Sequence, residues 1–144
     1  MKNKILILLS AVLLSALNIK AQTILPSAAA KISAEEFAAI LESPEGDQYL
    51  ILNTGPVNDI KNAVNIGAVE EKKNVKKLKK YLRNIPKDTP IVYYCGCCPF
   101  ATCPNLLPAA RLLEKMGFTN YRALDLPKSL KLDWVEKGYP MKHN

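Results

Sequence analysis

The sequence predicts one α/β domain in which helices cover both faces of a parallel sheet. Apolar runs of strand length alternate with amphipathic helical segments along the chain, a pattern typical of parallel sheets. The run "IVYY" at residues 91–94 is apolar throughout, as expected of a strand that is buried on both faces. The chain has 144 residues, enough for one domain with a substantial core.

The first 21 residues are expected to be a signal peptide. Lys2 and Lys4 precede an apolar run over residues 5–17, and Ala21 is a small residue at a suitable cleavage point. The run is shorter than the about 20 apolar residues that a membrane span needs. We therefore expect an exported protein, periplasmic or secreted, that contacts a membrane only where this segment is uncleaved. Residues 22–30 then form a linker, 31–140 the domain, and 141–144 a C-terminal tail.

Local signals define the elements of the domain. Ser33 and Glu36 form a capping box, in which each side chain is expected to satisfy a free backbone N–H. Asn105 is expected to cap a later helix that ends at Gly117. In chain order, the predicted elements are a helix within 31–43, strands at 48–53 and 62–69, a helix at 74–85, a strand at 89–95, a helix at 105–117, a strand at 120–126 and a helix at 129–138.

All four cysteines lie in the loop that follows the strand at 89–95, within "CGCCPFATCPN". In open α/β sheets, ligands bind at the carboxyl ends of the strands. Backbone N–H groups of such a loop, together with the dipole of the following helix, stabilise an anion. We therefore expect Cys95 to have a lowered pKa and to be present as a thiolate, which makes it the candidate nucleophile.

The ordered segments of the chain resemble the rhodanese-like domains. The resemblance covers about residues 31–140 and is carried by "KISAEEFAAIL", "LILNTG", "DIKNAVNIG", "IVYYC", "LLEKMGFTNYRAL" and "DWVEKGYP". It implies a rhodanese-like α/β fold and a possible sulfurtransferase activity without a cofactor. In such an activity, Cys95 accepts a sulfane sulfur as a persulfide. The implied partners are a small sulfur donor and a thiol acceptor.

The chain departs from the family pattern at several positions in and around the cysteine loop. Ala101 stands where a closing arginine is usual, Asn53 replaces an aspartate, Gly55 replaces an arginine, and Asp59 stands where histidine is common. Thiosulfate recognition would therefore lack its expected cation. We expect Asn53, Gly55 and Asp59 at the rim of the pocket. The loop residues expected around Cys95 are Gly96, Pro99, Phe100, Ala101, Thr102 and Asn105.

The other cysteines leave a redox function open. Cys97, Cys98 and Cys103 would regulate or resolve a persulfide on Cys95. Alternatively, Cys95 forms a disulfide with Cys98 or Cys103, which suits the oxidising setting of an exported protein.

Two further alternatives are a soft-metal site and a non-catalytic module. Four thiolates suit Zn²⁺ or Cu⁺. The spacing C-x-C-C-x4-C is not the paired C-x2-C pattern of structural zinc sites, however, and Pro99 and Pro104 stiffen the loop. The sequence therefore predicts no metal ligands. The non-catalytic module would be a structural or partner-binding loop.

Composition excludes several other functions. Loss of Lys2, Lys4 and Lys20 with the signal peptide lowers the net charge from +7 to +4, and no nucleic-acid partner is expected. The only histidine is His143, next to the C-terminus, so a Cys–His hydrolase would lack its base. The sequence does not predict an oligomeric state.

Overall fold

The structure is a computed structural model, and it describes residues 30–142. The predicted signal peptide, most of the linker and His143 lie outside the described residues. Ala30, which we assigned to the linker, is the first residue of the first strand. Two residues of the predicted tail fold back onto the domain: Met141 forms an antiparallel bridge with Ile60, and the Lys142 N–H donates to Asp59 O at 3.1 Å.

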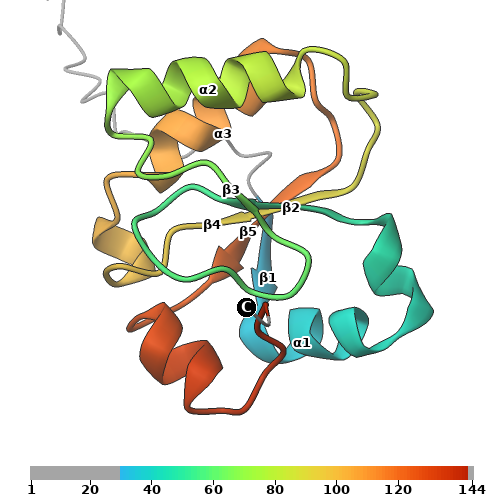
Figure 1. Ribbon diagram of the computed structural model, residues 1–144, viewed down its shortest axis with the longest axis vertical. Helices are drawn as coiled ribbons and strands as arrows, with labels where there is room; N and C mark the ends of the chain where they lie inside the picture. The colour runs from blue at the N-terminus through green and yellow to red at the C-terminus, as the bar shows by residue number, and fades with distance from the viewer. Residues whose placement is uncertain (1–29, 143–144) are drawn as a thin grey trace, which may run out of the picture.

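The described residues form one α/β domain around a five-stranded, all-parallel sheet (Figure 1). This confirms the predicted fold class, and the arrangement is consistent with a rhodanese-like fold. The order of the strands is β1-β5-β4-β2-β3, which places β4 at the centre of the sheet. The strands are β1 (Ala30–Ser33), β2 (Leu50–Asn53), β3 (Val64–Asn65), β4 (Ile91–Tyr94) and β5 (Tyr121–Asp125).

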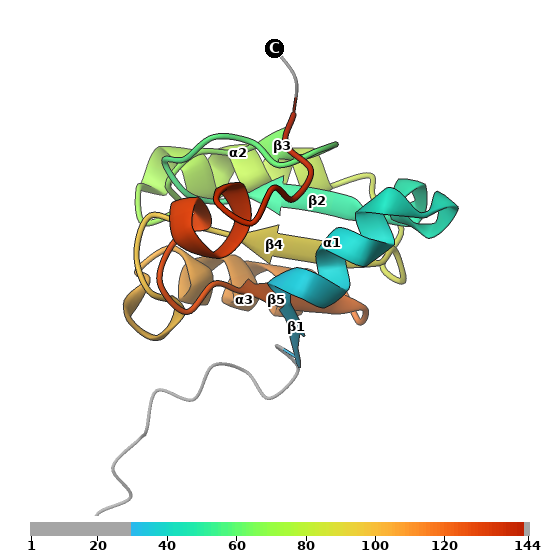
Figure 2. The same cartoon turned by 90° about the horizontal axis from the view of Figure 1, so that it is seen from below.

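Helices cover both faces of the sheet (Figure 2). Helices α2 (Lys72–Leu82) and α3 (Leu106–Lys115) pack on one face, whereas α1 (Ala34–Glu42) and the π-helical turn η3 (Lys131–Val135) pack on the other. Two short 3-10 helices complete the structure, η1 (Pro44–Gln48) and η2 (Phe100–Thr102). Among the described residues, no helix is both long enough and apolar enough to cross a membrane.

The alternation of side chains along β4 divides the core into two parts. Ile91 and Tyr93 contribute to the core under α2 and α3, and Val92 and Tyr94 to the core under α1 and η3. Successive side chains of a strand point to opposite faces. Cys95 therefore continues the parity of Ile91 and Tyr93, and it belongs to the α2–α3 core.

Helix α1 begins where the capping signal predicts. Ser33 Oγ accepts a hydrogen bond from the Glu36 N–H at 3.1 Å, which is one half of the predicted capping box. The Glu36 carboxylate has a different partner, since it accepts from Arg122 Nη1 at 3.1 Å. That ion pair links α1 to β5.

Several boundaries differ from the prediction. Helix α2 begins at Lys72 rather than residue 74 and ends at Leu82 rather than residue 85. The strand predicted at 62–69 is reduced to Val64–Asn65, because Asn62 with a φ of 63° and Gly67 with a φ of 87° leave the extended conformation on either side of it. The helix predicted at 129–138 is shortened to the five-residue π-helical turn η3.

Candidate functional site

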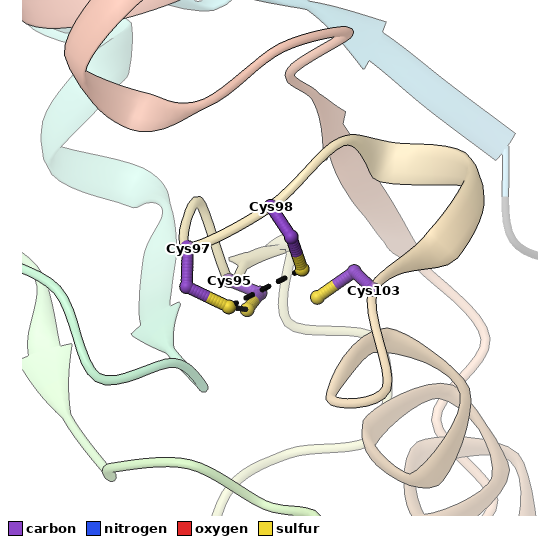
Figure 3. A group of neighbouring side chains, drawn as sticks. All are labelled: Cys95, Cys97, Cys98 and Cys103. Carbon is purple, nitrogen blue, oxygen red and sulfur yellow. Dashed lines mark hydrogen bonds between the residues drawn. The ribbon is translucent and has the colours of Figure 1, made fainter.

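The four cysteines meet at the carboxyl edge of the sheet, in the loop between β4 and α3. Their Sγ atoms all lie within 4.8 Å of one another (Figure 3). Strand β2 ends beside β4, with Asn53 paired to Tyr94, so the chain after β2 runs along the cysteine loop. Thr54 fixes this approach, because both its N–H and its hydroxyl donate to Tyr94 O at 2.8 Å.

Cys95 is buried at the base of the cluster, with 1% of its surface exposed. Its Sγ lies 3.1 Å from Cys97 Sγ and accepts a hydrogen bond from Asn105 Nδ2 at 3.3 Å. Gly55 packs directly against it, because a Cβ at position 55 would lie 2.8 Å from Cys95 Sγ and would clash with Cys95 O. The absence of a side chain at position 55 therefore allows this packing.

Asn105 holds its amide group in a fixed orientation. It is buried, and its Oδ1 accepts from the Glu70 N–H at 2.9 Å, which directs Nδ2 toward Cys95 Sγ. The expected capping role is wrong, because the Asn105 side chain makes no capping hydrogen bond to α3. Asn105 lies beside Cys95 as predicted, but its side chain donates a hydrogen bond to the Cys95 sulfur instead of capping α3.

The other three cysteines differ in exposure. Cys97 is exposed, Cys98 is partly buried and Cys103 is buried. Cys97 Sγ lies 3.3 Å from Cys98 Sγ, so its sulfur touches both a buried and a partly exposed thiol. Figure 3 shows Cys98 and Cys103 directed into the same space from opposite sides of the loop. Cys97 is thus the thiol that solvent and a ligand reach first.

The expected lowering of the Cys95 pKa is contradicted. Its interaction with the Cys103 thiol, followed by burial, raises the pKa of Cys95 well above its ordinary value, and this outweighs the lowering effect of the Cys97 backbone. Burial likewise raises the pKa of Cys97. Burial and the contact with Cys97 raise the pKa of Cys98 to about 11. Crowded neutral thiols in an apolar setting resist ionisation, so the surroundings of Cys95 favour its neutral form over the thiolate.

Gly96 and Phe100 attach the cysteine loop to the segment after β5. Gly96 has a φ of 72°, and a Cβ there would lie 2.6 Å from Leu130 Cβ. Its carbonyl accepts from the Leu130 N–H at 2.9 Å, and the Phe100 N–H donates to Leu126 O at 3.0 Å. The remaining loop residues are exposed on its outer side: Pro99, Ala101 and Thr102.

Of the three residues expected at the pocket rim, Gly55 alone contacts Cys95. Asn53 is fully buried and shapes the following turn, since it donates to Val57 O at 2.7 Å and accepts from the Gly55 N–H at 3.0 Å. Asp59 accepts from Asn53 at 2.9 Å and borders a separate cavity of about 500 Å³. Asn53 and Asp59 therefore position the turn that carries Gly55.

A cavity of about 550 Å³ opens beside the exposed thiol of Cys97. Its walls are mainly apolar, and Lys131 supplies a positive charge. The lining residues are Val57, Asn58, Gly96, Cys97, Ser129, Leu130, Lys131 and Val135. The contribution of η3 to this cavity was not predicted, because the pattern of residues 129–138 indicates a helix but not which part of the sheet that helix covers.

Comparison with models of protein families finds no match, and comparison with curated proteins finds none either. The class of protein is therefore defined by its fold and its site alone. The chain is an α/β protein with a four-cysteine loop at the carboxyl edge of a parallel sheet.

Proposed function

We propose that this protein transfers sulfur through a cysteine persulfide. The observation that carries the proposal is the pairing of an exposed thiol, Cys97, with a buried thiol, Cys95, at a sulfur–sulfur distance of 3.1 Å beside an open cavity. The consistency of the fold with rhodanese-like domains supports the same reaction class.

In the first step, the Cys97 thiol loses its proton to solvent, and the resulting thiolate attacks the sulfane sulfur of a small donor. Because burial raises the pKa of Cys97, this step is expected to become faster as the pH rises. For thiosulfate, the S–S bond of the donor breaks, sulfite leaves with the electron pair, and Cys97 carries a persulfide anion. We expected Cys95 to meet the donor. Because Cys95 is buried and Cys97 lines the cavity, we assign the first step to Cys97 instead. Lys131, whose Nζ lies 4.0 Å from Glu136 Oε1, lines this cavity and is the lysine that would attract an anionic donor.

In the second step, the outer sulfur moves from Cys97 to Cys95. The Cys95 sulfur bonds to it, the bond to Cys97 breaks, and the Cys95 proton passes to the Cys97 sulfur. Atoms and charge balance, and no free Cys95 thiolate is needed beforehand, which fits the raised pKa of this thiol. The Asn105 amide, 3.3 Å from Cys95 Sγ, then stabilises the buried anionic persulfide.

Intact-mass measurement tests the order of these steps. Reduced protein is incubated with thiosulfate or inorganic polysulfide, the donor is removed, and a mass increase of one sulfur atom is expected. Cys97→Ser should abolish the increase. Cys95→Ser should still load, but its adduct should react faster with an alkylating reagent, because the persulfide stays on the exposed residue.

Matched variants make the outcome decisive. The double variant Cys98→Ser/Cys103→Ser should load normally, and circular dichroism should verify that each variant is folded. Loading that persists in Cys97→Ser and disappears in Cys95→Ser would reverse the proposed order. Absence of loading in the reduced wild-type protein with both donors would refute sulfur transfer.

Thiol–disulfide exchange is the second candidate, and the same 3.1 Å distance favours it. Cys97 would attack a partner disulfide and release one thiolate. Cys95 would then attack Cys97 and release the second, so that two cysteines are oxidised and one disulfide is reduced. The intact-mass experiment separates the two reactions, since exchange leaves a Cys95–Cys97 disulfide that is two hydrogens lighter and carries no additional sulfur.

A further inference from the structure

The four cysteine sulfurs lie close enough together to coordinate a single metal ion. In a tetrahedral site with metal–sulfur bonds of about 2.3 Å, neighbouring sulfurs are about 3.8 Å apart. Here two of the sulfur–sulfur distances are 3.1 and 3.3 Å, and all lie within 4.8 Å. Side-chain movements of less than about 1 Å would bring four ligands to that spacing.

The chemistry of the donors selects the kind of ion. All four donors in the cluster are sulfur atoms, which suit Zn²⁺ and Cu⁺ and not Mg²⁺ or Ca²⁺, because the latter require oxygen ligands. An iron–sulfur cluster distributes its cysteine ligands over several metal atoms, which requires wider spacing than a single ion does. Pro99 and Pro104, which we expected to stiffen the loop, are compatible with a cluster in which the four sulfurs lie within 4.8 Å of one another.

We propose that Cys95, Cys97, Cys98 and Cys103 form a binding site for one thiophilic metal ion of the Zn²⁺ or Cu⁺ type. The site is largely built in advance. Asn105 donates to Cys95 Sγ and is itself fixed by Glu70, an arrangement that orients a ligand and stabilises its charge. The hydrogen bonds of Gly96 and Phe100 to the segment after β5 hold the loop that carries the ligands.

Metal binding at this site competes with the sulfur transfer proposed above. An ion held by Cys95 and Cys97 occupies the two sulfurs that a persulfide needs, whereas Cys98 and Cys103 are required by the ion alone. The metal ion must also displace the thiol protons, so its affinity falls as the pH is lowered. These properties allow the two proposals to be tested separately.

Titration of reduced protein with Co²⁺ under anaerobic conditions tests the site. Co²⁺ is a spectroscopic substitute for Zn²⁺. Thiolate-to-cobalt charge-transfer bands and the intense visible bands of a tetrahedral ion should saturate at one equivalent, and Zn²⁺ should bleach them. A parallel titration with Cu⁺ against bathocuproine disulfonate measures Cu⁺ binding. The two arms together determine which ion is preferred.

Variants identify the ligands. Loss of a residue that only hydrogen-bonds to a ligand typically lowers metal affinity by about 10- to 100-fold, so Cys98→Ser and Cys103→Ser should each lower it by at least about tenfold. Ala101→Ser is the matched control, because it adds a hydroxyl to the exposed outer side of the same loop. Its affinity should equal that of the wild type.

Three results would overturn the metal proposal. The first is less than half an equivalent bound in both the Co²⁺ and Cu⁺ titrations. The second is equal affinity in Cys103→Ser and Ala101→Ser. The third is a disulfide that persists under reduction and removes two ligands. Normal sulfur loading in the double variant Cys98→Ser/Cys103→Ser, which cannot form the four-sulfur site, shows that sulfur transfer stands without the metal.

Discussion

At the scale of single residues, the four cysteines share one functional group but differ in what surrounds it. Cys95 faces the core because it has the strand parity of Ile91 and Tyr93, and Gly55 closes over its sulfur. Cys97 follows Gly96, whose positive φ turns the chain outward. Burial and crowding raise the thiol pKa of both cysteines. Accessibility, rather than acidity, therefore separates the entry thiol from the buried one.

The contact between Gly55 and Cys95 predicts a large effect of a single methyl group. In Gly55→Ala, the new Cβ would clash with Cys95 O and lie 2.8 Å from Cys95 Sγ, so the backbone must shift. Overpacking of this kind costs about 1–3 kcal/mol. We expect the free energy of unfolding in urea to fall by that amount, and Cys95 to become more reactive toward alkylation.

Gly138→Ala is the control for Gly55→Ala. Gly138 has a φ of 74° but nothing within 4 Å of an added Cβ, so its substitution should cost about 1 kcal/mol through backbone strain and leave Cys95 reactivity unchanged. Gly55 has no such positive φ, so its loss of stability and the change in Cys95 reactivity are attributed to the contact with Cys95. If Gly55→Ala leaves both stability and Cys95 reactivity unchanged, the close packing over the buried thiol is wrong.

Asn105 illustrates how far the sequence determines a site. Its position before an apolar helix indicates an N-cap, and α3 does begin at the next residue. Its side chain nevertheless binds Glu70, which is 35 positions away, and Cys95. Local pattern locates the residue, but only the tertiary arrangement decides which donors and acceptors reach it. The burial of Cys95 can be predicted from the alternation of side chains along β4. The packing of Gly55 against Cys95 cannot, because it depends on how the turn after β2 lies against the loop.

At the scale of elements, α1 depends on one cap and one ion pair. Ser33→Ala removes the acceptor for the Glu36 N–H, which lies 3.1 Å from Ser33 Oγ. Loss of such a cap costs about 1 kcal/mol, and we expect that decrease in the free energy of unfolding in urea. Ser33→Asn keeps an uncharged acceptor at the same position, which avoids a like-charge pair with the neighbouring Asp125, and should restore stability to within a few tenths of a kcal/mol of the wild type. Equal losses in both variants would contradict the capping role.

Elements with strong periodicity were predictable, and those defined by their neighbours were not. Helices α2 and α3 follow from apolar residues at helical spacing, and β4 from its unbroken apolar run. Strand β3 is only two residues long, because Gly67 ends the extended conformation. The turn η3 is recognisable as helical, but its role as a wall of the cavity depends on Leu130 bonding to Gly96 across the sheet edge.

At the scale of the whole molecule, the site is built from distant parts of the chain. The turn after β2 supplies Gly55, the loop after β4 supplies Cys95, and the segment after β5 holds that loop through Leu126 and Leu130. The parallel order of the strands brings their carboxyl ends to one edge, as the fold class predicts. Cys95 and Cys103 are also members of the α2–α3 core, so protonation at the site is linked to the stability of the domain.

This linkage predicts that the reduced protein becomes less stable as the pH rises above about 8.5, the ordinary pKa of a cysteine. Above that pH, Cys95 loses its proton in the unfolded chain but keeps it in the folded protein, because its folded pKa is raised. The folded state then binds more protons, so the free energy of unfolding falls with pH. For one such thiol, the decrease between pH 8.5 and 9.5 is about 1 kcal/mol.

Urea unfolding under reducing conditions at the two pH values measures this decrease. Cys95→Ala removes the titrating group. The variant should be less stable than the wild type at both pH values. The decrease in its free energy of unfolding between these values should be smaller than that of the wild type by about 1 kcal/mol. Cys97 is exposed whereas Cys95 is buried, so we expect Cys95 to contribute more to this decrease and Cys97→Ser to retain most of the wild-type pH dependence. Identical pH dependence in the wild type and Cys95→Ala would mean that Cys95 ionises as readily in the folded protein as in the unfolded chain. The buried neutral thiol on which the proposed transfer step depends would then be excluded.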